Sequence, residues 1–226
     1  MKFVVLFSCA VGLLAVPTVA TTLTKKQKLT WIFLTSGTGG TGFTKPELAT
    51  MQTEHLGNFT RLFGRKKLVA AGPLSDPTKT KRGIVVLVST NKKEVLESFK
   101  PDPFVQHQIL KVEPTTIEVQ FGAIGSTEIS PDGIEENRLV IFTSKSPLNQ
   151  EAKRQHELHL AEGRAAGLAF FATSTIKTAD FYAVALFRGT NDAAISDWVN
   201  SYPLVKSGSL TAITMPQWLG KGFLGK

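Results

Sequence analysis

Cysteine is almost absent from this sequence, and histidine is scarce. Cys9, the single cysteine among the 226 residues, lies in an apolar stretch near the N-terminus. This excludes a disulfide framework, a catalytic thiolate and a cysteine-bound metal for the rest of the chain. His156 and His159 are three positions apart, which can suit a metal, but no third histidine or carboxylate stands at metal spacing beside them. We expect no metal, no cofactor, and a solvated or half-buried histidine pair.

Acidic residues are also few, so the chain is basic. Lys and Arg number 26 against 18 Asp and Glu, which gives a formal net charge of +8. The basic residues stand in short separate groups such as Arg65-Lys66-Lys67 and Lys92-Lys93, and no basic stripe with interleaved aromatic residues is present. This distribution is typical of solvated faces, so we expect no nucleic-acid partner. Weak attraction to an anionic cell surface or an anionic ligand stays open.

The first twenty residues have the pattern of a secretory signal. Lys2 supplies a positive n-region, Phe3 to Val16 is almost wholly apolar, and Thr18-Val19-Ala20 offers a small-residue cleavage site. The apolar stretch is short and wrongly flanked for a membrane span, which takes about 20 residues. We predict a signal peptide over 1–20, no membrane span, and a secreted or periplasmic protein.

A scattered set of residues recurs about one hundred positions later. His55 is followed by an apolar run ending in Gly-Pro at 68–73, and His156 stands 101 positions after His55. Asp102 begins an Asp-Pro-Phe sequence, and Tyr202 begins Tyr-Pro-Leu 100 positions later. The spacing predicts two copies of one unit. The change from aspartate to tyrosine predicts that the second copy has lost chemistry that the first has kept.

Each copy shows the pattern β-α-β-β-α-β. In the first copy, 29–36 and 83–89 read as strands, Thr44-Lys45-Pro46-Glu47 fits a helix capping box, and Thr90 is the expected N-cap of the second helix. We predict an α+β fold of two ferredoxin-like βαββαβ units packed sheet to sheet, because each sheet carries helices on one face only. The expected boundaries are 28–122 and 137–216 for the two units, 123–136 for a polar linker, and 217–226 for a surface tail.

A glycine-rich loop, Gly37 to Gly42, contains the sequence G-x-G-x-x-G between a strand and a helix. That is the context of a dinucleotide fingerprint, but the next strand ends in Gly72-Pro73 and lacks the acidic residue that would bind a ribose. A loop tip is the preferred interpretation. Phosphate contact through the loop amides is the alternative.

The combination of His55-Leu56, the run 68–73, Asp102-Pro103-Phe104 and Val112-Glu113-Pro114 resembles the YCII-related family of the dimeric α+β barrel superfamily. The resemblance covers 28–122, and the second copy is similar to a degenerate member. It implies two ferredoxin-like units whose sheets form a barrel with a cavity, which members usually build as dimers. The superfamily includes oxygenases, and also lyases, isomerases and dehydrochlorinases that act on small cyclic or aromatic compounds.

The resemblance further implies a His55–Asp102 pair at the active site. His55 lies on the apolar face of its helix, and a nearby carboxylate could hold its ring in one tautomer and stabilise its cation, as an acid/base histidine requires. The alternative is a buried, purely structural histidine, with Asp102 capping a turn. The expected lining of a substrate pocket is Gly72, Pro73, Ser75 and Phe104.

Two functions therefore stay open. The first is a cofactor-free enzyme of the lyase, isomerase or hydrolase type on a small organic ligand, with His55 moving a proton and Asp102 orienting the ring. The second is a non-catalytic ligand-binding or stress-related module, which the loss of the aspartate in the second copy favours. The fused pair could also associate as a homodimer.

Overall fold

The computed structural model describes residues 27–125, 133–168, 171–175 and 182–224. The predicted signal peptide and residues 126–132 of the predicted linker lie outside these ranges. The described elements follow one another as β1 (Lys28–Ser36), α1 (Lys45–Gly64), β2 (Leu68–Pro73), β3 (Lys81–Leu87), α2 (Lys92–Phe99), α3 (Pro103–Gln106), β4 (Leu110–Gly122), β5 (Ile134–Thr143), α4 (Gln150–Ala165), β6 (Phe171–Thr175), β7 (Ala183–Arg188), α5 (Asp192–Ser201), α6 (Pro203–Lys206) and β8 (Thr211–Gly220).

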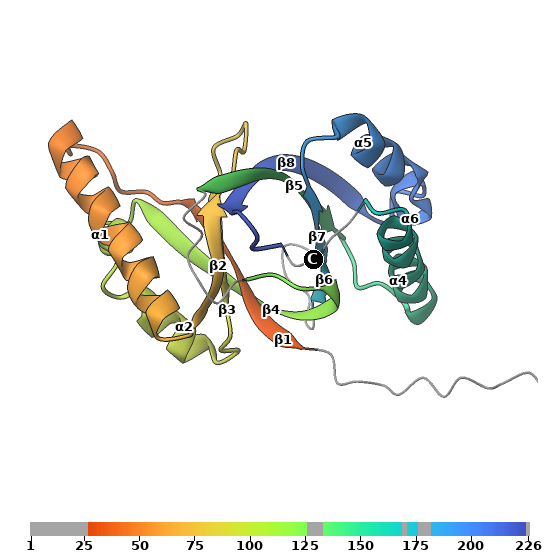
Figure 1. The fold of residues 1–226 in the computed structure, drawn as a ribbon, viewed down its shortest axis with the longest axis horizontal. Helices are drawn as coiled ribbons and strands as arrows, with labels where there is room; N and C mark the ends of the chain where they lie inside the picture. Colours follow the sequence, from red (N-terminus) through yellow and green to blue (C-terminus); the bar gives the residue numbers. More distant parts are fainter. Residues whose placement is uncertain (1–26, 126–132, 169–170, 176–181, 225–226) are drawn as a thin grey trace, which may run out of the picture.

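The strands form one eight-stranded antiparallel sheet in the order β2-β3-β1-β4-β6-β7-β5-β8. The pairing of β4 with β6 joins the first half of the chain to the second. The outer strands also approach each other, because Leu74 forms a bridge with Gln217 of β8 and the Ser75 amide donates to the Pro216 carbonyl at 2.9 Å. The sheet is therefore nearly closed, and Figure 1 shows it between two groups of helices.

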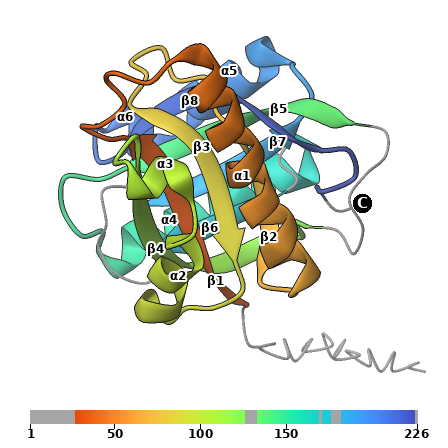
Figure 2. The same cartoon turned by 90° about the vertical axis from the view of Figure 1, so that its left-hand side faces the viewer.

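This is a mixed α/β fold in which the strands of both halves follow the same spatial order. Side chains alternate between the barrel interior and the helical layers. Trp31 of β1 points inward, where its ring stacks on that of Phe171 with centroids 6.5 Å apart. Ile32 points outward into a cluster with Val95 and Phe99 of α2. Figure 2 shows α1, α2 and α3 covering the outer face of the first half.

The starts of the helices are set by side-chain caps. The predicted capping box of α1 is present, because Thr44 Oγ1 accepts from the Glu47 amide and Glu47 Oε2 accepts from the Thr44 amide at 2.7 Å. The predicted N-cap of α2 is wrong by one residue. Asn91 takes that place instead of Thr90, because its side-chain carbonyl accepts from the amides of both Lys93 and Glu94.

The end of the chain differs from the predicted surface tail. β8 extends to Gly220 because it pairs with β5 along its whole length, and β5 itself begins at Ile134, inside the predicted linker. Beyond β8, Leu224 forms a bridge with Ile124, and both Phe223 and Leu224 are buried in the interior cluster of the barrel. These two apolar side chains therefore close one end of the barrel.

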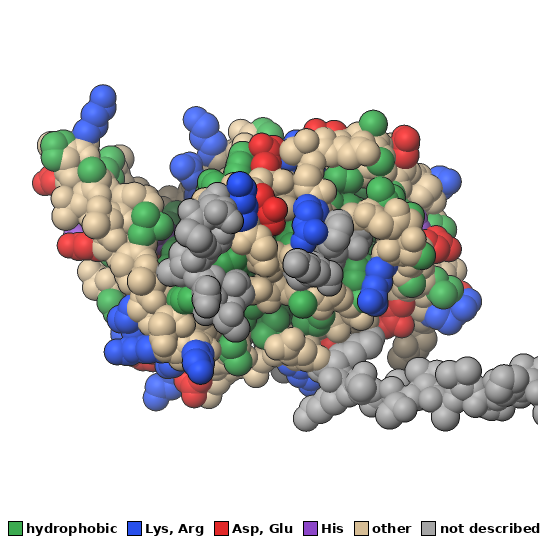
Figure 3. Space-filling model, in the orientation of Figure 1, with side chains coloured by type: hydrophobic (Ala, Val, Ile, Leu, Met, Phe, Trp, Pro, Cys, Tyr) green, Lys and Arg blue, Asp and Glu red, His purple; other side chains and the backbone are tan. Residues whose placement is uncertain are grey.

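The charged side chains on the surface are not gathered into one patch of a single sign on the face drawn in Figure 3. On the face that Figure 3 shows, Lys and Arg side chains are spread among acidic and apolar ones. No helix among the described residues is long and apolar enough to cross a membrane.

Candidate functional site

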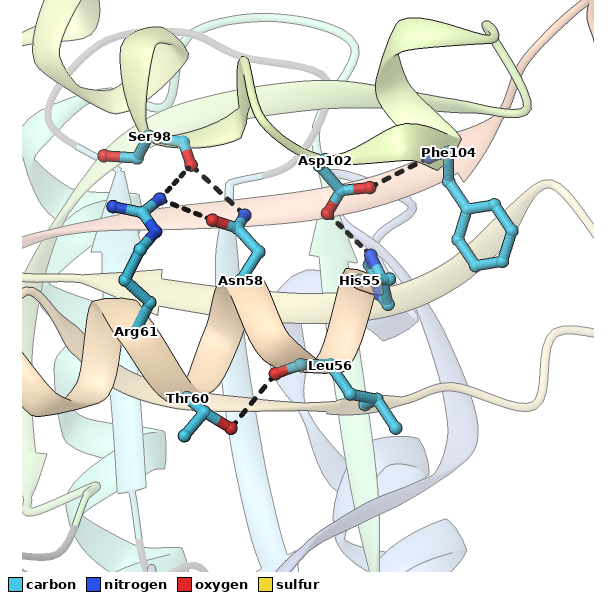
Figure 4. Close-up of polar contacts among 8 residues, drawn as sticks. All are labelled: His55, Leu56, Asn58, Thr60, Arg61, Ser98, Asp102 and Phe104. Atoms are coloured by element: carbon cyan, nitrogen blue, oxygen red, sulfur yellow. Dashed lines mark hydrogen bonds and ion pairs between the residues drawn. The ribbon is translucent and has the colours of Figure 1, made fainter. Parts of the chain in front are cut away.

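One face of α1 turns inward and carries His55, Asn58 and Leu62, which are all buried. Their spacing of three and four residues places them in a single stripe. Asn58 donates to the Ser98 carbonyl of α2 at 3.2 Å, and Arg61 donates to the side-chain oxygen of Asn58. Figure 4 shows these bonds one turn away from His55. They fix α1 against α2 and so fix where the His55 ring lies.

Asp102 stands at the N-cap of α3, opposite His55. Its Oδ1 accepts from the Phe104 amide at 3.1 Å, and its Oδ2 lies 2.6 Å from Nδ1 of His55. The side chain of Asp102 has no exposed surface, while that of His55 retains 9%. The Asp102 carboxylate therefore caps a helix and holds the His55 ring at the same time. From the sequence alone, these two roles were alternatives. The structure brings these two predicted residues together (Figure 4).

The partner of His55 determines its tautomer. Because a carboxylate can only accept, Nδ1 of His55 carries the proton, and Nε2 of the neutral ring keeps its lone pair. Nε2 has no hydrogen-bond partner among the described residues. It is also absent from the set of polar atoms that are both fully buried and without a partner, so it is not fully buried. It therefore keeps contact with solvent. The ring centroids of Phe59 and Phe104 lie 4.5 and 5.2 Å from the centroid of the His55 ring, so the ring has apolar neighbours.

The second half repeats the arrangement with different chemistry. Nδ1 of His156 on α4 meets the hydroxyl of Tyr202, which stands at the N-cap of α6. Burial lowers the pKa of His156 to about 3, with a smaller contribution from the charge of His159. His159 is also buried, stacks on Tyr202 and donates to the Trp198 carbonyl at 3.1 Å. The expectation of a solvated or half-buried histidine pair is therefore wrong.

Three of the four predicted pocket residues lie elsewhere. Gly72, Pro73 and Ser75 stand at the seam where the end of β2 meets β8. A Cβ at Gly72 would lie 1.8 Å from the Trp218 carbonyl oxygen, so glycine is needed there for the close approach of the two strands. Phe104 alone of the four contacts the His55 ring.

The glycine-rich loop packs against the C-terminal end of α3. The amides of Gly37 and Gly39 donate to the carbonyls of Ile109 and Gln108, both at 2.8 Å. A Cβ at Gly37 would lie 1.8 Å from the Gln108 carbonyl oxygen. These glycines therefore allow two backbone segments to touch. Their amides are already bonded, which removes the basis for phosphate contact at these two positions.

A concave site lies at one mouth of the barrel, away from His55 and Asp102, and no motif in the sequence indicated it. Phe33 and Glu113 from the first half and Ile141 and Ile213 from the second are among its lining residues. The described residues contain no group of three or more His, Cys, Asp or Glu side chains that could hold a metal ion.

Comparison with known proteins establishes the fold of this chain. No family model matches the sequence, and no curated protein is similar to it. Among solved structures, a mutant of chlorite dismutase from Candidatus Nitrospira defluvii is 11% identical, with a TM-score of 0.58 over 88% of this chain and 93% of that one. A candidate monooxygenase from Lactobacillus acidophilus is 12% identical, with a TM-score of 0.51 over 85% of this chain and 93% of that one.

A second candidate monooxygenase, from Fusobacterium nucleatum subsp. nucleatum, is 9% identical, with a TM-score of 0.55 over 89% of this chain and 98% of that one. These likenesses extend along nearly the whole of each protein at very low identity. The chain therefore shares the fold of these structures, a mixed α/β fold with an eight-stranded, nearly closed antiparallel sheet. Activity has to be argued from its own residues.

Proposed function

We propose that this protein is a cofactor-free enzyme that acts on a small organic molecule, with His55 as its general acid and base. The observation that supports this most directly is the 2.6 Å contact of His55 Nδ1 with Asp102, combined with an Nε2 that has no described partner and is not fully buried. A catalytic histidine needs one nitrogen held and the other free.

In this proposal Nε2 of the neutral His55 takes a proton from a carbon atom of the substrate. The ring becomes a cation, which the Asp102 carboxylate stabilises across the existing hydrogen bond. The electron pair left on the substrate expels a leaving group or moves to a neighbouring atom. The His55 cation then returns the proton to that group or atom, so elimination and isomerisation both balance without a cofactor.

The contrast between the two halves supports one active centre per chain. His156 has no exposed surface, its Nε2 is fully buried without a partner, and its lowered pKa keeps the ring neutral. Tyr202 offers a neutral hydroxyl where Asp102 offers a charge, because burial raises the pKa of its phenol. A cation on His156 would therefore have neither water nor a carboxylate to stabilise it.

We further propose that each half is a ferredoxin-like unit related to the YCII family, and that the chain is secreted. The shared strand order of the halves and the matching positions of His55 and His156 on α1 and α4 support a fused pair. A single chain would then supply both sheets of the barrel. The apolar stretch before Ala20 supports export.

The test uses small cyclic compounds that carry an acidic C–H beside a carbonyl group or a leaving group. Proton exchange and product formation are followed by NMR in D2O with wild type, His55→Gln and His107→Gln. General acid–base catalysis contributes about 10²–10⁴-fold to a rate, so we expect His55→Gln to lose that factor. The exposed His107 is the matched control and should retain the full rate. Equal rates for wild type and His55→Gln would contradict the proposal.

The second candidate function is a non-catalytic ligand-binding module. The low exposure of the pair favours it, because His55 is only 7% exposed. Carbethoxylation by diethyl pyrocarbonate, mapped by mass spectrometry, separates the two functions. A His55 that reacts has an accessible Nε2, as an enzyme requires. If His55 stays unmodified while His107 reacts, and no compound is turned over, the pair is structural and the enzyme proposal is contradicted.

A further inference from the structure

The open mouth of the barrel contains a cavity of about 70 Å³. It lies at the end of β5 and β8 opposite to the end that Phe223 and Leu224 close. One buried water needs roughly 10–15 Å³, so a group of several heavy atoms fits. The lining residues are Phe33, Lys81, Glu113, Thr115, Ile141, Thr143, Ile213 and Met215.

This cavity is separate from the His55–Asp102 pair. Phe33, Ile141 and Met215 belong to the interior cluster of the barrel, whereas His55 lies on α1, outside the sheet. The cavity is thus reached from the end of the barrel and not from the helical layer. An inference about it does not rest on the proposed function.

Two opposite charges flank one aromatic ring at this mouth. The Lys81 ammonium lies over the Phe33 ring, 5.4 Å from its centroid, and Glu113 is the direct partner of Phe33 in the β1–β4 ladder. Glu113 Oε1 accepts from the Thr35 hydroxyl at 2.9 Å. Neither charge forms an ion pair with the other or with any other residue in the described part of the chain. The Lys81 ammonium also interacts electrostatically with the buried Asp76, which accepts from the Lys81 amide at 2.8 Å, but the two side chains form no ion pair. The mouth therefore presents a cation and an anion to a ligand.

The opposite side of the mouth carries three apolar side chains, Ile141, Ile213 and Met215, beside Thr143. In the β5–β8 ladder Ile141 faces Ile213, at the place where Phe33 faces Glu113 in the first half. Ile213 is 49% exposed, so its side chain is accessible to a ligand at the rim of the cavity. The cavity thus combines two opposite, unpaired charges on one wall with the branched apolar side chains of Ile141 and Ile213 on the other.

We propose that this mouth binds a zwitterionic α-amino acid with a branched apolar side chain. The ligand carboxylate meets Lys81, its ammonium meets Glu113, and its side chain covers Ile213 and enters the cavity. A zwitterion satisfies both rim charges at once. A ligand with a single charge would pair with one rim charge and cover the other, which would then have neither water nor a partner. That is unfavourable.

The test compares three probes of similar shape by NMR titration of the ¹⁵N-labelled chain. L-Leucine carries both charges, 4-methylpentanoate carries only the anion, and 3-methylbutylamine carries only the cation. We expect leucine to bind at least tenfold more tightly than either analogue. The amide signals of Thr143 and Ile213 should shift, and those of His55 and Asp102 should not.

Variants assign the two charges. Lys81→Met and Glu113→Gln should each weaken leucine binding at least tenfold, since each removes one charge and keeps the shape of the side chain. Lys92→Met, at the exposed start of α2, is the matched control and should bind as wild type does. The spectrum of each free variant verifies that it is folded. Equal affinity for leucine and 4-methylpentanoate overturns the proposal in favour of a simple anion site. Absence of leucine binding at millimolar concentration overturns it altogether.

Discussion

Tyr202 occupies in the second half of the chain the place that Asp102 occupies in the first. Each residue stands at the N-cap of a four-residue helix and meets Nδ1 of a histidine on the preceding long helix. Asp102 also caps its helix through Oδ1, whereas Tyr202 makes no capping bond. A charged contact with a solvent-reachable ring in one half is thus matched by a neutral, fully buried contact in the other.

Replacing Asp102 by asparagine should reverse the tautomer of His55. The asparagine carbonyl would keep the cap on the Phe104 amide, and its NH2 group would then face His55 Nδ1 as a donor. Nδ1 would have to accept, so the ring proton would move to Nε2. We expect long-range ¹H–¹⁵N NMR to show a proton on Nδ1 in wild type and on Nε2 in Asp102→Asn.

The same substitution should lower any activity that depends on His55, because the lone pair of Nε2 is lost. The helical amide signals of α3 serve as the control and should stay in place. A ring that keeps its proton on Nδ1 in Asp102→Asn would show that the carboxylate does not set the tautomer.

His156 should make the protein sensitive to acid. Burial lowers its pKa from 6.5 to about 3, so between these values the unfolded chain binds a proton that the folded chain does not. This contribution to stability is complete above pH 6.5 and is lost as the pH falls toward 3, by about 1.4 kcal/mol per pH unit. Urea unfolding between pH 6.5 and about pH 3, the window that these pKa values define, measures the slope.

His156→Leu should flatten this dependence on pH, whatever its effect on stability at neutral pH. His107→Gln, which changes an exposed ring, should leave the slope unchanged. A His156→Leu protein with the same acid sensitivity as wild type would assign that sensitivity to other groups.

The order of the elements could be predicted because the patterns that encode it are local. The apolar strand around Val85 and the capping box at Thr44 need only a few neighbouring residues to be recognised. The contact of His55 with Asp102 joins positions 47 apart in the chain. It followed from a family resemblance, since no local rule pairs two residues across two strands and a helix.

The seam and the mouth of the barrel could not be predicted for the same reason. Gly72 reads as a pocket residue when one half is considered alone, but its neighbour in space is Trp218 of the other half. No local pattern in the sequence indicates a shared site for Lys81 and Glu113, which are 32 positions apart. They become a candidate binding site only when Ile213 is brought opposite them by the closure of the sheet.

A methyl group at Gly72 should open that seam. The new Cβ would lie 1.8 Å from the Trp218 carbonyl oxygen, which is backbone and cannot rotate away. We expect Gly72→Ala to lower the free energy of unfolding by about 1–3 kcal/mol or more, as overpacking does. Gly57→Ala is the matched control, because a Cβ there meets nothing within 4 Å and alanine favours a helix by about 0.5–1 kcal/mol. Urea unfolding of both variants should give shifts of opposite sign.

The end of the chain should contribute to stability because it closes the barrel. Leu224 is 1% exposed, lies in the interior cluster and bridges to Ile124. Leu224→Ala should cost about 2–5 kcal/mol, the range for a leucine truncated in a core. Leu56→Ala removes the same atoms from a side chain that is 52% exposed and should change stability by less than about 0.5 kcal/mol. Equal and small effects of the two substitutions, measured by urea unfolding, would show that the chain end lies on the barrel without closing it.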